Sequence, residues 1–176
     1  MKIRHFVFLA ILSVLTACNT PQTKVTTHYD EFSGSTDMLA DNELPSPVQP
    51  REVVWLDAFR LVRDGKRVYY FEARYLATAE VGWLEIEPGV SLIVTADGQT
   101  FRFVTASGSL NSRELVRKKA FAAEKALYEV SKEQLFKIAQ AKQVKVQIKG
   151  TKGLVERDFG PKNLQDFRSF VSRYVM

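Results

Sequence analysis

The sequence predicts an α+β fold in the carboxyl-terminal part of the 176-residue chain, behind a secretory signal and a polar segment. Two observations predict it. Two pairs of β-branched and aromatic runs are each joined by a short turn containing Asp-Gly, a strong hairpin signal. The last fifty residues then alternate between strand-like and helix-like periods. These patterns indicate a mostly antiparallel sheet of two hairpins followed by a strand–helix–strand–strand–helix unit, with the helices packed on one face.

Residues 1–17 have the three parts of a secretory signal peptide. Lys2 and Arg4 give a positive start, an apolar run of about ten residues follows, and small residues end it. A helix that spans a bilayer needs roughly 20 apolar residues, so this run is too short for a permanent membrane helix. We therefore expect residues 1–17 to be removed as a signal.

The signal ends in Leu15, Thr16, Ala17 and Cys18, and Cys18 is the single cysteine of the chain. This stretch resembles the lipobox of bacterial lipoproteins, in which the cysteine thiol takes a diacylglyceryl group and the chain is cut before it. The resemblance implies a lipid anchor of palmitate-like acyl chains, and two or more such chains hold a protein stably on a membrane. The alternative is an ordinary signal peptide with a chance cysteine.

Asn19 follows the cysteine. In enterobacteria-like sorting, an Asp at this position retains a lipoprotein in the inner membrane, and its absence favours export. The resemblance therefore implies the periplasmic side of the outer membrane, with the inner membrane as the alternative.

Residues 18–50 are predicted to be the lipidated cysteine and a flexible tether. They are rich in Thr, Ser, Asp and Pro and show no sustained apolar period, so they cannot bury enough surface to fold. As a flexible coil, the tether would span roughly 30 Å on average. A single folded domain is then expected over residues 51–176.

Two hairpins are predicted at the start of this domain. Val53–Arg63 and Arg67–Thr78 flank one Asp-Gly turn, and Val90–Thr95 and Thr100–Thr105 flank another. A weak short strand is expected over Trp83–Glu87.

Period-2 alternation in the first strand assigns four apolar residues to one buried face, which Asp57 interrupts: Val53, Trp55, Phe59 and Leu61. In the second strand, Tyr69, Phe71, Ala73 and Tyr75 share the buried face. Residues 113–122 fit either a helical turn or an edge strand, and their period does not separate the two.

The last fifty residues predict a strand, a capped helix, two strands and a final helix. Ser131 and Gln134 form a capping box that starts a helix ending near Lys142. The remaining strands and the last helix are expected at Ala126–Val130, Val144–Ile148, Leu154–Phe159 and Pro161–Tyr174.

This carboxyl-terminal part resembles a segment of small secreted or lipidated bacterial envelope proteins of unknown function. The resemblance is carried by the Tyr-containing strand 124–130, a Leu/Ala helix, a Val/Ile strand ending at Gly150, and residues 163–170 of the last helix. It implies a sheet with helices across it, and it brings no activity.

The predicted domain contains neither histidine nor cysteine, because His5, His28 and Cys18 all precede it. This excludes Ser-His-Asp and Cys-His catalysis and zinc sites built from His and Cys. The sequence has no glycine-rich phosphate loop and no nucleic-acid motif, so no cofactor, metal or nucleic-acid partner is expected. An enzyme would have to use carboxylates, lysine or tyrosine.

Charge is divided unevenly along the chain. Residues 51–176 carry 22 Lys/Arg and 15 Asp/Glu, a net charge of +7, whereas residues 19–50 are acidic. The densest basic group favours contact with an anionic lipid or glycan, although a solvated face gives the same pattern: Arg113, Arg117, Lys118 and Lys119.

Three acids lie near Trp83, at Glu80, Glu85 and Glu87. A carboxylate pair beside an aromatic ring is typical of a sugar-cleaving site. Acids at every second residue are equally typical of the solvent face of an edge strand.

These observations predict a non-catalytic binding or accessory module of the cell envelope, lipid-anchored and with an envelope protein or an anionic lipid or glycan as partner. One alternative is a carrier or sensor of a small amphiphile. Another is a carboxylate-based enzyme that acts on glycans. The sequence leaves the oligomeric state open.

Overall fold

The computed structural model describes residues 24–30, 34–46, 51–116 and 119–176. Strands hold 60% of these residues and helices hold 16%, in two antiparallel sheets. The predicted α+β fold class, with one sheet covered by helices on one face, is therefore wrong. The chain folds as a β-rich protein, because segments expected to be tether or left ambiguous form further strands.

Six strands form the larger sheet, in the order β1-β2-β3-β4-β8-β7. It consists of β1 (Lys24–Asp30), β2 (Gly34–Ala40), β3 (Glu52–Arg63), β4 (Lys66–Thr78), β8 (Lys119–Val130) and β7 (Leu110–Val116). Every neighbouring pair is antiparallel.

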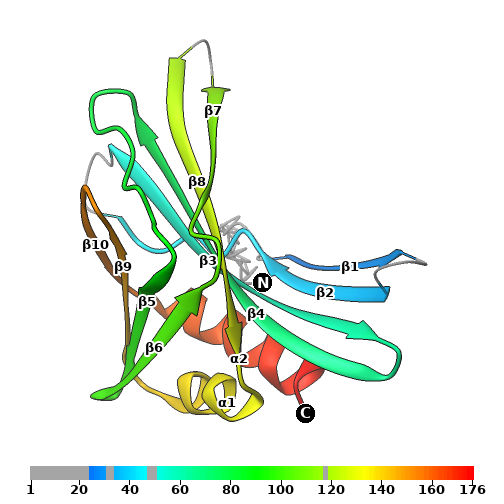
Figure 1. Ribbon diagram of the computed structural model, residues 1–176. Helices are drawn as coiled ribbons and strands as arrows, with labels where there is room; N and C mark the ends of the chain where they lie inside the picture. The colour runs from blue at the N-terminus through cyan, green and yellow to red at the C-terminus, as the bar shows by residue number, and fades with distance from the viewer. Residues whose placement is uncertain (1–23, 31–33, 47–50, 117–118) are drawn as a thin grey trace, which may run out of the picture.

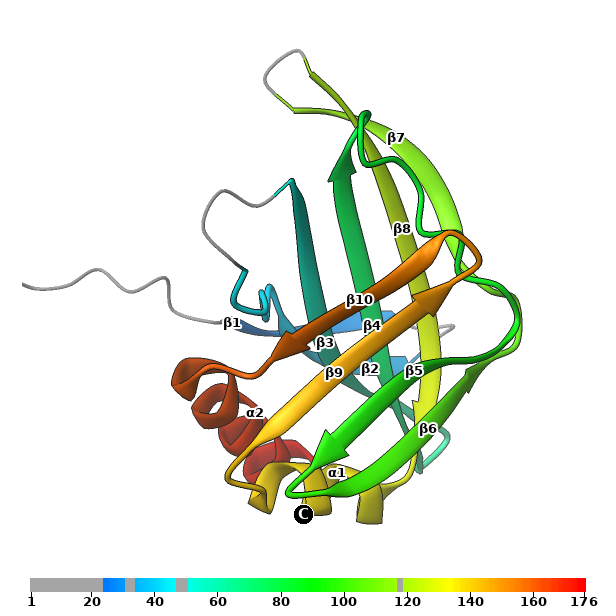
Figure 2. The same ribbon diagram turned by 90° about the vertical axis from the view of Figure 1, so that its left-hand side faces the viewer.

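The smaller sheet has four strands in the order β10-β9-β5-β6. It consists of β10 (Gly153–Asp158), β9 (Val144–Gly150), β5 (Gly89–Ala96) and β6 (Gln99–Thr105). It lies across one face of the larger sheet, and α1 (Lys132–Gln140) and α2 (Pro161–Tyr174) lie together at one end of the two sheets (Figures 1 and 2).

The core lies between the two sheets and α2. Phe71 on β4 meets Phe103 on β6 edge-to-face, with ring centroids 5.4 Å apart, and stacks on Phe167 of α2 at 6.0 Å. Tyr128 on β8 is fully buried, and its hydroxyl lies 3.0 Å from the Ser91 hydroxyl on β5. Aromatic burial of this kind stabilises the contact between the sheets.

Local signals predicted several elements correctly. Both Asp-Gly hairpins are confirmed as β3–β4 and β5–β6. The Ser131–Gln134 capping box is confirmed at the start of α1, although the helix ends at Gln140 rather than near Lys142. The last helix has its predicted bounds, with Pro161 in its first turn, where a missing N–H costs nothing.

The prediction of an unfolded tether is wrong over residues 34–46. β2 pairs with the edge of β3, and Leu39 and Leu44 are 1% and 0% exposed. Arg60 on β3 forms an ion pair of 2.6 Å with Asp37 on β2. The polar composition concealed this, because only alternate residues of an edge segment have to be apolar.

Two further local predictions are corrected by the structure, and one open alternative is decided. The segment 83–87 contains no strand. Residues 113–116 belong to the edge strand β7 and residues 119–122 to β8, which decides between the helical turn and the edge strand. In β3 the buried apolar residues are Val54, Leu56 and Ala58. The four residues assigned to the buried face in the sequence analysis therefore face away from the smaller sheet.

Candidate functional site

The candidate site is the face of the six-stranded sheet that points away from the smaller sheet, here called the outer face. Strand alternation places a set of partly exposed apolar side chains on it: Met38, Val53, Trp55, Phe59, Leu61, Tyr70, Leu76, Leu110 and Leu127. Phe59 and Tyr70 stack with ring centroids 5.0 Å apart. An antiparallel sheet that faces water normally carries polar residues there, so this composition is typical of an interaction surface.

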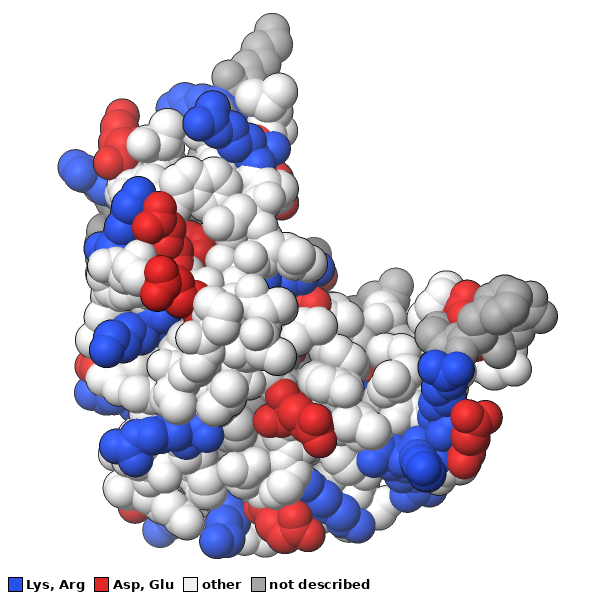
Figure 3. Space-filling view, in the orientation of Figure 1, with Lys and Arg blue, Asp and Glu red and all other residues white. Residues whose placement is uncertain are grey.

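The outer face is concave. The space-filling view shows a mostly uncharged hollow between the body of the molecule and the arm that ends in β1 and β2 (Figure 3). A cavity of about 120 Å³ lies on this face, and its lining includes Trp55, Leu76, Leu110 and Lys125. The Arg74 guanidinium lines it too and lies 4.8 Å from the Trp55 ring centroid, in a cation–π contact.

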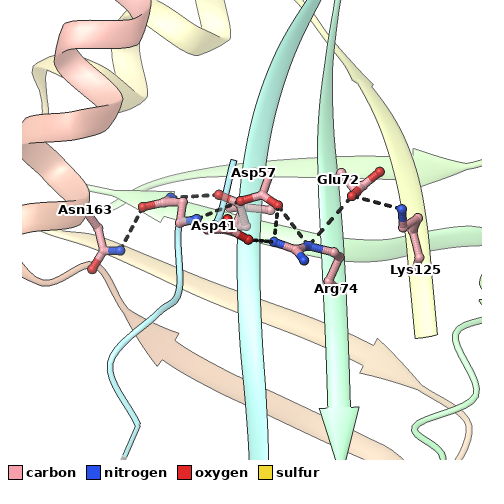
Figure 4. Close-up of polar contacts among 8 residues, drawn as sticks. Asp41, Asp57, Glu72, Arg74, Lys125 and Asn163 are labelled. Atoms are coloured by element: carbon pink, nitrogen blue, oxygen red, sulfur yellow. Dashed lines mark hydrogen bonds and ion pairs between the residues drawn. The ribbon is translucent and has the colours of Figure 1, made fainter. Parts of the chain in front are cut away.

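A network of charged side chains crosses the outer face, centred on Asp57 (Figure 4). Asp57 accepts hydrogen bonds from the Arg74 guanidinium at 2.9 Å and from the Asn42 backbone N–H at 2.8 Å. Asp41 binds the same guanidinium at 3.0 Å, and Glu72 lies 3.4 Å from the Lys125 ammonium. The acids of this network are therefore paired with cations.

Asn42 connects the network to the rest of the fold. Its side chain donates to the Leu56 carbonyl at 2.7 Å and accepts from the Asn163 amide of α2 at 2.8 Å. Residues 41–44 continue the edge of β3 beyond the end of β2, since Leu44 N–H donates to the Val54 carbonyl. The network thus fixes this segment against both the sheet and the helix.

Burial affects the pKa values of the central ion pair, Asp57 and Arg74. It raises the pKa of Asp57 to about 6, because desolvation outweighs the stabilisation that Arg74 and the Asn42 amide give to the carboxylate. Burial also opposes the charge of Arg74, but the Asp57 and Asp41 carboxylates raise the pKa of Arg74 above its ordinary value. The Asp57 side chain is 0% exposed, so the group is structural rather than open to a substrate.

A second cavity of about 190 Å³ lies where the β7–β8 hairpin leaves the sheet. Two aromatic residues, one cation and several small residues line it: Trp83, Phe121, Arg113, Ala79, Gly82, Ala120 and Ala122. We call this the Trp83 cavity. Apolar walls with one well-placed charge are typical of a site for an amphiphilic group.

The Glu124 carboxylate holds one wall of the Trp83 cavity in place. It accepts hydrogen bonds from the backbone N–H groups of Leu84, Glu85 and Ile86 and from the Ser109 hydroxyl. These amides would otherwise be available for a strand ladder, which explains why the strand expected over Trp83–Glu87 does not form. Glu124 therefore determines the position of Trp83.

The predicted site residues fall in different places. Leu15, Thr16, Ala17 and Cys18 lie outside the described residues, so the lipobox remains a prediction. Arg113 on β7 and Lys119 on β8 are exposed near the hairpin tip. Arg117 and Lys118 are outside the described part of the chain.

The acids near Trp83 do not have the environment of a general acid. Glu85 binds Lys152 at 2.7 Å and the Thr151 hydroxyl at 3.0 Å, and these hydrogen bonds lower the pKa of Glu85. A general acid for glycoside cleavage needs its pKa raised instead. Glu80 and Glu87 are exposed.

Sequence reasoning did not identify Asp57, Glu124 or Asn163 as organising residues. Asp57 was visible as an acid that interrupts an apolar alternation, which is the one signal available. Its partners on residues 41 and 42 were assigned to the tether, and Glu124 was included in the Tyr-containing strand 124–130 without a role of its own.

Two further properties of the described residues bear on function. No group of three or more His, Cys, Asp or Glu side chains among them could hold a metal ion. None of the helices in the described ranges is long and apolar enough to cross a membrane.

The fold and its surface define a β-rich protein of two antiparallel sheets with an apolar, concave outer face. Compared with known proteins, the chain matches no family model, no curated protein and no solved structure. Its function must therefore be argued from its own surfaces.

Proposed function

We propose that the protein is a non-catalytic binding module of the bacterial cell envelope, anchored through Cys18 to the periplasmic side of the outer membrane. In this proposal its outer face binds another envelope protein. The observation that supports the proposal most strongly is the apolar, partly exposed composition of a face that would otherwise be polar.

The outer face favours a convex, largely uncharged protein surface as its occupant. Its hollow matches such a shape (Figure 3), and the partly exposed rings of Trp55, Phe59 and Tyr70 supply the aromatic anchors that dominate protein interfaces. Asp57 and Glu72 already have cations as neighbours, so the partner does not have to bring a counter-charge. An unpaired charge on the partner would be penalised there.

The buried groups and cavities give less support to the alternatives. A glycan-cleaving enzyme needs two accessible carboxylates, whereas Asp57 is enclosed and Glu85 is paired with Lys152. A carrier needs an apolar cavity of roughly 300–1,000 Å³. The cavities beside Trp55 and Trp83 measure about 120 and 190 Å³. A further cavity of about 420 Å³ has charged residues in its lining, among them Arg67, Glu129 and Lys132, so it is not the apolar cavity that a carrier needs.

The test is site-specific photocrosslinking in cells. A photoreactive amino acid replaces Leu127, which is 44% exposed on the outer face, and in a second strain it replaces Val104, which is 57% exposed on β6 of the other sheet. We expect one dominant envelope protein to be captured from position 127 and not from position 104.

A second pair of variants separates binding from chance proximity. Leu127→Glu should abolish co-purification of the captured protein without a crosslinker, because a carboxylate would be buried unpaired, while Val104→Glu should preserve it. Equal capture from both positions, or co-purification that survives Leu127→Glu, would exclude the outer face as the binding surface.

A further inference from the structure

The Trp83 cavity has a chemical character different from that of the outer face. It combines Trp83, small side chains and Arg113, and Phe121 also lines it, although strand alternation places the Phe121 side chain on the face of its pairing residue Glu114. We propose that it binds the headgroup phosphate of an anionic membrane phospholipid, with the adjoining lipid methylenes against the aromatic wall. The proposal rests on the placement at a membrane proposed above, and it adds a second surface with its own ligand.

Arg113 is the group that would bind the phosphate. Its guanidinium forms no ion pair or hydrogen bond with another residue in the described ranges, so this group is available to an anion. Its neighbour Glu114 follows strand alternation to the opposite side and lines the outer-face cavity instead. Arginine binds phosphate oxygens through paired N–H groups, which makes it well suited to this ligand.

Exposed apolar and basic side chains continue from the cavity along the hairpin. Leu115 is 80% exposed and shares a face of β7 with Arg113, two residues away. Lys119 on the pairing strand is exposed near the same tip. Tryptophan, lysine and arginine are the side chains that prefer the headgroup level of a bilayer, so the combination fits a membrane surface better than free solvent.

The cavity is preorganised by the fold. The three consecutive amides of Leu84, Glu85 and Ile86 bind the Glu124 carboxylate, and Thr151 N–H donates to the Glu85 carbonyl at 2.9 Å. The segment next to Trp83 is therefore held at two points. A preordered aromatic wall lowers the entropic cost of binding a lipid.

Two tryptophans make a direct test available, because Trp55 lies on the outer face and Trp83 in the cavity. The chain from residue 18 onward is prepared with Cys18→Ser, so that no lipid anchor brings it to a membrane. Trp55→Phe leaves Trp83 as its sole tryptophan. The probes are vesicles of phosphatidylethanolamine with phosphatidylglycerol, vesicles of phosphatidylcholine alone, and inorganic phosphate.

We expect the emission of Trp83 to shift to the blue with the phosphatidylglycerol vesicles and to stay unchanged with the other two probes. Arg113→Gln should weaken vesicle binding about fivefold, the effect of one cation near an anionic surface. Arg102→Gln removes the same charge from an exposed position on β6 and should leave binding unchanged. Residues 117 and 118 stay as they are in every variant.

Other outcomes would overturn the inference. These are no shift with phosphatidylglycerol, an equal shift with phosphatidylcholine, a shift with inorganic phosphate alone, or equal losses in Arg113→Gln and Arg102→Gln. The matched Trp83→Phe chain, which reports from Trp55, should not respond to vesicles. No partner protein is present in this experiment, so its failure leaves the crosslinking test of the outer face unaffected.

Discussion

Asp57 is the residue whose environment departs most from what its sequence position suggests. Its pKa of about 6 in the folded protein lies above the ordinary value of 3.8. A group of this kind stabilises the fold fully below its unfolded-state pKa, and the stabilisation is lost as the pH rises through the folded-state pKa. The free energy of unfolding should therefore fall between about pH 4 and pH 6, by up to about 3 kcal/mol.

Replacing Asp57 tests this directly. Asp57→Asn should remove that pH-dependent component, because an amide does not titrate. Urea denaturation followed by circular dichroism, at intervals from pH 4 to pH 7.5, measures the slope in the parent and the variant. Asp41→Asn is the matched control, since Asp41 binds the same arginine but its side chain is 77% exposed. If the free energy of unfolding changed with pH by the same slope in the parent and in Asp57→Asn, the raised pKa would not belong to Asp57.

For individual residues, the sequence was better at excluding kinds of chemistry than at identifying which residues organise the site. Residues 51–176 contain neither His nor Cys, but the folded part of the chain also includes β1 with His28, so the exclusion of histidine chemistry holds for residues 51–176 alone. Asp57 and Glu124 gain their roles from the Asn42 amide and from the amides of residues 84–86, which are distant in sequence. Such partnerships depend on chain crossings that local patterns do not encode.

Among the secondary-structure elements, the end of β9 passes unusually close to the segment that carries Trp83. A Cβ atom built on Gly150 would lie 1.9 Å from the Leu84 carbonyl oxygen. Lys152 N–H donates to that same carbonyl at 3.1 Å, so the contact is part of the structure of the turn. Only glycine permits two backbones to approach in this way.

A pair of glycine variants should separate this close approach from general turn flexibility. Gly150→Ala should lower the free energy of unfolding by roughly 3 kcal/mol, because backbone atoms have to move. Gly153→Ala, at the other end of the same turn, would place its Cβ 3.7 Å from a Leu84 methyl group and should change stability by less than about 0.5 kcal/mol. Thermal denaturation measures both, and equal losses would show that the contact with Leu84 is not the cause.

The elements that could be predicted are those defined by their own residues. The Asp-Gly turns and the Ser131 capping box fix β3–β4, β5–β6 and the start of α1 locally. β2 was not recognised as a strand, because its ladder with β3 joins segments that a stretch of polar sequence separates. Residues 113–122 were left open between a helical turn and an edge strand, because their period does not separate the two. Local alternation also did not show that the two hairpins belong to different sheets, which is why the predicted fold class failed.

For the molecule as a whole, the first prediction concerns the anchor. Cys18→Ser should leave the protein unlipidated and release it from membranes on fractionation. A high-salt wash belongs in the protocol, because it removes electrostatic contacts with anionic lipid and leaves acyl anchors in place. A variant that still sediments with membranes after this wash would contradict lipidation at Cys18.

The position of β1 also changes how far the protein could reach from a membrane. β1 begins at Lys24, six peptide steps after Cys18, and an extended chain covers at most about 3.6 Å per residue. If Cys18 carries a lipid, the first strand of the fold would therefore lie within roughly 20 Å of the membrane anchor. The tether expected over residues 18–50 would have allowed a larger distance. Short linkers of this kind keep two binding sites at effective concentrations in the millimolar range. An outer face whose affinity is too low to bind a partner free in solution would then still be occupied by a partner in the same membrane. We therefore expect that partner to be a membrane-held protein rather than one diffusing through the periplasm.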